Sequence, residues 1–523
     1  TRQRLREAPA EVAASRVNVA EATSASLEAY EHYFRGGQLE ERTRYDEALA
    51  EFRAALEVDP AFALAHYRIA YLGEFTGLEA RERQKHIEAA VANSGKVGEK
   101  ERILIRAWQA HMEKHNEEAH QIYAQAVEAW PQEKEVLYMA ADLYFHEGQT
   151  EKARPLFDRA LQLDPTWEPA LVHLVDCLGM AVGGKEELLV RSARWVEQSP
   201  GPSSYRSLAL ALAQNGRLDE ALQNARRAYG MEANRWTRGT LAEILCHRGA
   251  FSEVEALLEP VVANRNRSTS GTATSRTLQG YERANAVGYY AAALAFQGRR
   301  REALRALETL RELPQAAAPY HEMRLQHFLG ESGLNEARAE FAALLRAAQS
   351  DPKSDDKKKK EMLAALAAAV GDLEGAAVLV RSLEAGSTAE MMYRGVAAWR
   401  SRRFDEAAAA LRPLSERGGE PRAFASYLLG EVEAARGRPA EALEAMERFR
   451  GTFGGAFWKT WAWPRSLIVE ARSLDALGRR AEARDKLNQL LESWKRGDRD
   501  APILVEARAL AEKLRDKTAS SRP

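Results

Sequence analysis

The chain of 523 residues has little of what disulfide-rich, membrane-spanning or nucleic-acid-binding proteins need. Its two cysteines, Cys177 and Cys246, exclude a disulfide scaffold. Its apolar runs are far shorter than the roughly 20 residues of a membrane span, and no apolar core of a signal peptide follows Thr1–Arg6. The 75 basic and 76 acidic residues leave a formal net charge of −1, so the basic field that nucleic-acid binding requires is missing. We therefore expect a soluble protein that binds no nucleic acid and does not insert into a membrane.

Motifs of catalysis and cofactor binding are absent as well. The chain has no Walker-type loop, GxGxxG, nucleophile elbow or HExxH motif. Its one histidine cluster contains His111, His115 and His120. The first two are four residues apart and could share a helix face and bind a divalent metal, but a turn expected near Lys114–Glu118 would spoil that face. We expect no cofactor and no catalysis, and a metal-dependent enzyme is the least favoured hypothesis.

The sequence does contain an internal repeat. A small residue is followed 12, 16, 19 and 24 residues later by a second small residue, an aromatic one, a third small residue and a proline. This pattern starts at Gly36, Ala107 and Ala141, and the last two starts are 34 residues apart. Small residues let two antiparallel helices approach, and the aromatic residue fills the next gap. No alternating pattern of strands competes with it, so the fold is predicted to be all-α.

A glycine usually follows seven residues after the first small residue, where the first helix of a pair should end in a left-handed conformation. These glycines are Gly148, Gly216, Gly249, Gly298, Gly371, Gly437 and Gly478.

The pattern resembles the tetratricopeptide repeat over most of the chain. The resemblance implies an α-solenoid of about a dozen helix-turn-helix repeats, wound into a right-handed superhelix whose first helices line a concave groove. The amphipathic segment Ala501–Lys517 is expected to be the C-terminal capping helix. The expected organisation is a lead-in at 1–26, an N-terminal array at 27–263, a polar loop or hinge at 264–280, a C-terminal array at 281–500, and the capping helix and tail at 501–523.

The groove is the predicted binding site. Residues at offsets −6, −3, +1 and +4 from the small residue of a first helix should face inward, where aromatic side chains typically anchor a peptide or helix. Each could equally pack against its neighbours. The candidates are Tyr30, Tyr33, Trp108, His111, Tyr138, Asp142, Phe145, Arg206, Trp236, Glu243, Met392, Trp399, Tyr427 and Glu431.

A second candidate surface is the tryptophan cluster Trp458, Trp461 and Trp463, which precedes the last full helix pair. A core or capping role is the favoured interpretation, because an exposed tryptophan is costly, and a docking patch is the alternative.

The lead Thr23–Tyr30 resembles the start of the repeat regions of large bacterial signalling proteins, including membrane-anchored serine/threonine protein kinases. In those proteins the effector precedes the repeats, so we expect this chain, which begins at Thr1, to be a piece of a longer polypeptide. The Gly-rich loop and the His-Arg-Asp and Asp-Phe-Gly motifs of kinases are absent from this sequence.

The predicted function is a protein-interaction or sensor module that binds a peptide or protein partner in its groove and could regulate such an effector. The alternative is a self-associating scaffold, a homo-oligomer. A free-standing protein would be cytoplasmic, and one joined to such a kinase would be tethered to the membrane.

Overall fold

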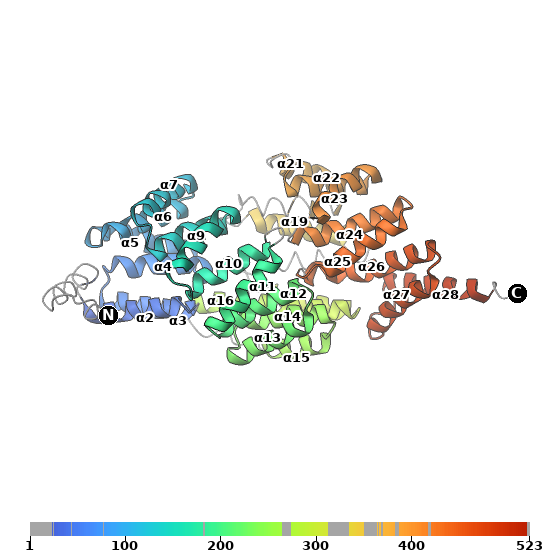
Figure 1. The fold of residues 1–523 in the computed structure, drawn as a ribbon, viewed down its shortest axis with the longest axis horizontal. Helices are drawn as coiled ribbons and strands as arrows, with labels where there is room; N and C mark the ends of the chain where they lie inside the picture. The colour runs from blue at the N-terminus through green and yellow to red at the C-terminus, as the bar shows by residue number, and fades with distance from the viewer. Residues whose placement is uncertain are drawn as a thin grey trace. The chain divides into compact units, whose positions relative to one another are not determined.

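The structure is a computed structural model of the chain. It describes residues 24–519 except the single positions 25, 43, 77 and 455 and the segments 181–183, 264–272, 312–333, 350–362, 364–365, 368–369, 382–385 and 417–419. The described residues are helices joined by short turns, and none of them forms a strand (Figure 1). The all-α prediction is confirmed.

The chain divides into two compact units with the main boundary near Leu178, and the described residues 197–199 and 273–279 also belong to the first unit. The helices that lie wholly or mainly before the boundary are α2 (Leu27–Glu40), α3 (Tyr45–Val58), α4 (Ala63–Thr76), α5 (Ala80–Ala92), the 3-10 helix η2 (Ser94–Lys96), α6 (Glu99–Met112), α7 (Asn116–Ala129), α8 (Lys134–His146), α9 (Thr150–Leu163) and α10 (Glu168–Met180).

The helices after the boundary are α11 (Lys185–Gln198), α12 (Pro202–Gln214), α13 (Leu218–Met231), α14 (Arg235–Arg248), α15 (Phe251–Ala263), α16 (Ala273–Phe296), α17 (Arg300–Glu308), α19 (Leu334–Gln349), α21 (Leu373–Val380), α22 (Thr388–Arg400), α23 (Phe404–Glu416), α24 (Glu420–Ala435), α25 (Pro439–Gly451), α26 (Ala456–Ala476), α27 (Arg480–Ser493) and α28 (Pro502–Ala519).

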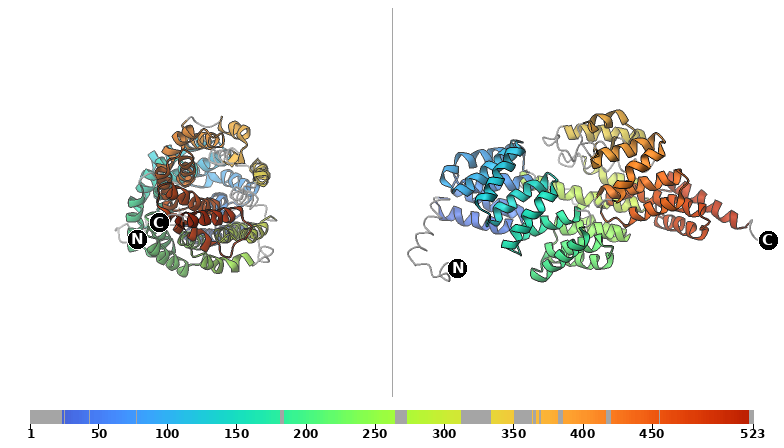
Figure 2. Two further views of the ribbon diagram at one scale, coloured as in Figure 1. Left: turned by 90° about the vertical axis from the view of Figure 1, so that its right-hand side faces the viewer. Right: turned by 45° about the horizontal axis from the view of Figure 1, so that its top comes forward.

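Most of the described helices pack mainly on a neighbour along the chain. The pairs α2–α3, α8–α9, α12–α13, α22–α23 and α24–α25 are in close contact, and α22–α23 remains beside α24–α25 in each view (Figure 2). First helices of successive pairs also touch, as α12 touches α14 and α22 touches α24. Within a unit the first helices therefore form one layer and the second helices another.

Residues that lie 16 positions apart in the repeat are in contact, and this contact holds the two helices of a pair together. A Cβ atom added at Gly36 would lie 2.6 Å from Cε1 of Phe52, which is fully buried. An added Cβ at Gly430 would meet the side chain of Met446 at the same distance. The small residue thus provides the space that the large residue of the second helix fills.

The turn inside each pair needs a left-handed residue. The seven glycines predicted for this place all have positive φ angles, between 73° and 84°. Two turns use other residues at the same offset: Lys114 has φ 65° and Arg402 has φ 56°. The predicted glycine positions are confirmed, and the two exceptions carry local strain.

The C-terminal helix α28 covers the end of the array. Its residues Ile503, Leu504, Ala507 and Leu514 are buried against α26 and α27, in a cluster with Trp494. The capping helix was therefore predicted correctly.

Two boundaries differ from the sequence prediction. Part of the expected loop at 264–280 is helical, because α16 begins at Ala273 and no glycine or proline interrupts the segment before Gly280; residues 264–272 lie outside the described part. The tryptophan cluster lies inside α26, which begins at Ala456 and continues through Pro464, rather than before the last pair. The remaining domain limits and the handedness of the superhelix stay predictions.

Candidate functional site

The predicted groove residues differ in exposure according to their offset from the small residue. Six of the nine at offsets −3 and +1 are buried, with at most 7% of their surface exposed: Trp108, Tyr138, Asp142, Glu243, Met392 and Tyr427. None of the five at offsets −6 and +4 is buried: Tyr30, His111, Phe145, Trp236 and Trp399. The remaining three residues at offsets −3 and +1 are half-buried: Tyr33, Arg206 and Glu431. The middle of each first helix is therefore covered by its neighbours, whereas its ends remain accessible.

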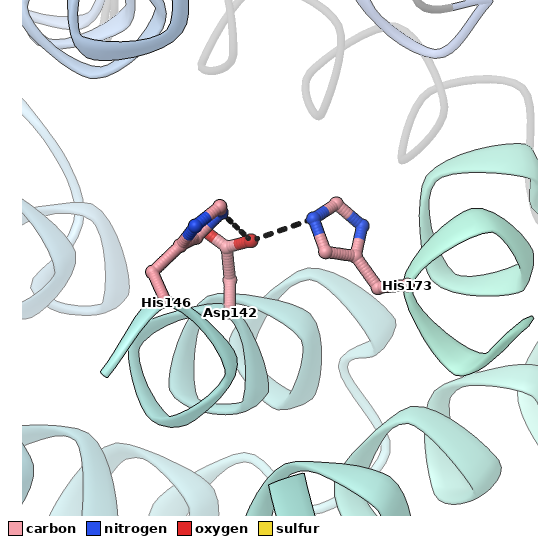
Figure 3. Close-up of side chains that lie close together, drawn as sticks. All are labelled: Asp142, His146 and His173. Atoms are coloured by element: carbon pink, nitrogen blue, oxygen red, sulfur yellow. Dashed lines mark ion pairs between the residues drawn. The ribbon is translucent and has the colours of Figure 1, made fainter. Parts of the chain in front are cut away.

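In the first unit, three residues of two helices form a polar centre. Asp142 and His146 lie one turn apart on α8, and His173 lies on α10 (Figure 3). The atom Oδ1 of Asp142 is 3.3 Å from Nε2 of His146 and 3.2 Å from Nε2 of His173. The side chains point toward one another from successive first helices. We call this group the Asp-His-His centre.

Burial differs strongly among the three side chains. Asp142 is 1% exposed, His173 is 12% exposed and His146 is 41% exposed. The carboxylate of Asp142 is therefore shielded from solvent, and the centre is accessible to solvent mainly at His146.

A second set of contacts fixes the centre. Tyr71 of α4 donates its hydroxyl hydrogen to Oδ2 of Asp142 at 3.1 Å. Nδ1 of His173 lies 2.9 Å from the carbonyl oxygen of Pro169, which makes Nδ1 the donor and leaves Nε2 without a proton in the neutral ring. The rings of Tyr138 and Phe145 stand edge-on to the His173 ring at 5.6 and 4.8 Å. These contacts hold the carboxylate of Asp142 and the imidazole ring of His173 each in one orientation.

The electrostatics of the centre favour a charged carboxylate. Burial raises the pKa of Asp142, but the ion pairs with His146 and His173 and the hydrogen bond from Tyr71 outweigh it and hold that pKa below its usual value. Burial, with Asp142 nearby, raises the pKa of Tyr71 well above 10. Tyr71 is thus a neutral donor and Asp142 an anion at neutral pH.

The repeat offsets predict Asp142 as a groove residue, but they do not select Tyr71, His146 or His173. Tyr71 could have been found, because Ala70 lies 34 residues after Gly36 and Tyr71 occupies offset +1. His146 is at offset +5 from Ala141, one position beyond the offsets considered. His173 belongs to a helix with no small residue in register, so its unit offered no reference position.

The histidine pair considered for metal binding is not brought together. α6 ends at Met112 and α7 begins at Asn116, so the turn lies at 113–115, slightly before the predicted Lys114–Glu118, and it does separate His115 from the helix of His111. His111 faces Glu74 at 3.9 Å, while His115 is exposed beside Glu113 and Glu118. Neither belongs to a group of three metal-binding side chains among the described residues.

In the second unit, Trp236 is an exposed aromatic residue of α14 at an offset that is predicted to face inward. It is 48% exposed, and its amide hydrogen is bonded to the capping Asn234. The guanidinium carbons of Arg206 and Arg235 lie 5.6 and 4.7 Å from the centre of its ring, within the range of cation–π attraction. The result is a partly exposed aromatic ring with two positive charges close to it.

The tryptophan cluster is described only in part. Trp463 is half-buried and stands edge-on to Phe296 of α16 at 6.1 Å, which is a packing contact within the second unit. The side chains of Trp458 and Trp461 lie outside the described residues, so a docking role for the cluster stays a prediction.

Comparison with known families identifies the repeat. Residues 110–178 and 394–456 match tetratricopeptide repeat families, and a third such family matches residues 202–227, 284–309 and 464–487. These segments are similar to tetratricopeptide repeats. The first of them contains the whole Asp-His-His centre, and helices α12, α16, α22 and α26 lie wholly or partly within the others.

No curated protein matches the chain. Among solved structures, the crystal structure of the APC/C hetero-tetramer Cut9–Hcn1 is 12% identical in sequence, with 94% of this chain and 97% of that chain covered and a TM-score of 0.33. A likeness of this degree supports no conclusion about function. Tetratricopeptide repeats form extended surfaces for protein binding, which is the level of function that the matches support. No helix in the described part of the chain combines the length and the apolar character of a membrane span.

Proposed function

We propose that the chain is a protein-interaction module and that it holds a partner segment against the exposed ends of its first helices. The observation that carries this proposal is Trp236, a large aromatic side chain that is 48% exposed at an offset predicted to face inward. A monomeric protein gains nothing in stability from such exposure, and tryptophan is the residue most enriched at the centres of binding surfaces.

The surroundings of Trp236 favour a particular kind of partner segment. Arg206 and Arg235 border the ring, so an apolar or aromatic side chain flanked by carboxylates would match the surface. The helix α14 is fixed by its Asn234 cap and by contacts with α12 and α13. A rigid aromatic anchor loses little conformational freedom when it binds.

A peptide-display selection on the whole chain tests the proposal. We expect enriched peptides that combine an aromatic or aliphatic residue with Asp or Glu, and we expect Trp236→Ala to weaken their binding at least tenfold. The matched control is Phe34→Ala, since Phe34 is 55% exposed on α2 at an offset that should not face inward. Equal binding of the selected peptides to Trp236→Ala and to the unchanged chain would refute the proposal.

A regulatory role is a separate proposal that rests on the sequence alone. The lead Thr23–Tyr30 resembles that of bacterial signalling kinases, and on this basis the module would regulate an effector encoded before Thr1. The coding sequence upstream of Thr1 tests it. A Gly-rich loop and a His-Arg-Asp motif there would support a kinase, and a frame without an effector domain would refute it.

A further inference from the structure

We propose that the Asp-His-His centre is a binding site for a divalent transition-metal ion such as Zn²⁺, with Oδ1 of Asp142, Nε2 of His146 and Nε2 of His173 as its ligands. The inference does not depend on the proposed function. The three residues are the one group of at least three metal-binding side chains whose ligand atoms come within 4.8 Å of one another in the described part of the chain.

The distances match a metal site better than a hydrogen-bonded ion pair. Zinc binds histidine nitrogen and carboxylate oxygen at about 2.0–2.1 Å, so two ligands of a tetrahedral site are about 3.3–3.4 Å apart. The two oxygen–nitrogen distances at Asp142 are 3.3 and 3.2 Å. A charge-assisted hydrogen bond is shorter, about 2.7–2.9 Å.

The same unit contains a histidine–carboxylate pair of that shorter kind. Nε2 of His120 and Oε2 of Glu147 are 2.7 Å apart and form a hydrogen bond. In contrast, Oδ1 of Asp142 is buried and accepts no hydrogen bond from any described residue, although two histidine nitrogens lie close to it. A buried carboxylate oxygen without a hydrogen bond is costly unless a cation occupies the space between these atoms.

The surrounding contacts are those of a metal site. A histidine ligand usually donates its other ring N–H to a carbonyl or carboxylate, and here Nδ1 of His173 faces the carbonyl oxygen of Pro169. A ligating carboxylate is usually hydrogen-bonded through its second oxygen, and here Tyr71 donates to Oδ2 of Asp142. Each contact orients a ligand atom toward the centre.

The ligand types select the class of ion. Two imidazole nitrogens and one carboxylate suit Zn²⁺ and its neighbours in the first transition row, whereas Mg²⁺ and Ca²⁺ prefer oxygen ligands throughout. Three protein ligands leave at least one position open. His146, at 41% exposed, lies on the accessible side, so the open position could take water or a side chain of a bound partner.

The test is calorimetric titration of the metal-stripped full chain with Zn²⁺. We expect one site that is lost or weakened at least 100-fold in His173→Gln and in His146→Gln. Tyr71→Phe should weaken it about tenfold, as expected for a residue that only orients a ligand. The control is His120→Gln, which removes a histidine paired with a carboxylate in the same unit and should leave the affinity unchanged.

The variants are chosen so that a loss of metal binding can be distinguished from a loss of folding. His146 is partly exposed, so its replacement by Gln leaves the helix and its packing in place, which circular dichroism checks. A Co²⁺ titration gives a second readout, because bound Co²⁺ in a four-coordinate site acquires an absorption spectrum that the His146→Gln variant should lack. Zn²⁺ affinity that is the same in His146→Gln and His173→Gln as in the unchanged chain, or an absence of binding to the unchanged chain, would overturn the proposal.

Discussion

Lys459 is a buried lysine whose removal should stabilise the protein. It lies on α26 with 5% of its surface exposed, and its ammonium group donates to the carbonyl oxygen of Thr452 and lies 5.6 Å from the ring centre of Phe449. Burial lowers its pKa from 10.5 to about 8, although the carboxylate of Glu243 acts in the opposite direction. The folded state therefore binds this proton less tightly than the unfolded chain does.

The size of the effect follows from the change in pKa. Lowering the pKa from 10.5 to about 8 corresponds to about 3 kcal/mol at about 1.4 kcal/mol per pKa unit. Replacing Lys459 by Met removes this cost at pH 7 and keeps a side chain of similar length. It also leaves the carbonyl oxygen of Thr452 without that donor, which costs about 1 kcal/mol. The expected net gain at pH 7 is about 2 kcal/mol.

The pH dependence gives the sharper test. Between about pH 8 and 10.5 the unfolded chain carries the proton and the folded one does not, so the contribution of Lys459 to stability rises with pH over this window. Urea unfolding of the unchanged chain and of Lys459→Met should therefore differ most at pH 7 and converge toward pH 10.5. Lys495→Met, at a lysine that is 62% exposed, is the control and should change little. A difference between Lys459→Met and the unchanged chain that stays constant with pH would refute the reasoning.

Three further predictions concern the turns and a thiol. Gly298→Ala should lower the free energy of unfolding by about 2–5 kcal/mol, because φ is +73° and an added Cβ would lie 2.5 Å from Cδ2 of Trp494; Gly216→Ala, with the same kind of φ and open space, should cost only about 1–2 kcal/mol. Equal losses in urea unfolding would contradict this. Arg402→Gly should raise the unfolding free energy by about 0.5–1 kcal/mol by relieving its left-handed strain, and a loss of stability would count against it. The thiol of Cys177 should resist iodoacetamide in the native protein and react after unfolding, because the thiol is buried and burial raises its pKa to about 12. Detection of alkylated Cys177 in the native protein by mass spectrometry would contradict this.

The helix pairing could be predicted from the sequence because one physical contact repeats in many units. The contact between Gly36 and Phe52 recurs between Gly430 and Met446, with the same spacing and the same lack of room for a Cβ atom. The left-handed turns have the same property, since only glycine avoids the steric cost. Such features depend on local backbone geometry, which a periodic pattern reports directly.

The polar centre could not be predicted in the same way, because it does not repeat. Asp142 was assigned to the groove as an isolated inward residue, and nothing in the spacing linked it to a histidine of the next pair. Its partner His173 lies on α10, whose sequence has no small residue at the expected position. The distance between side chains of two successive first helices depends on how these helices pack, and a one-dimensional pattern does not contain that information.

The exposure pattern of the first helices explains where a partner can make contact. A small residue draws neighbouring helices close, so side chains at offsets −3 and +1 from it, such as Tyr138 and Asp142, become buried. At the helix ends this approach is relaxed, and Trp236 and Phe145 keep part of their surface accessible. Replacing a buried residue of a first helix therefore changes the packing of the repeat, whereas replacing an accessible residue near its end changes the exposed surface and leaves the packing in place. For this reason Trp236 separates a binding role from a structural one, which Tyr138 cannot do.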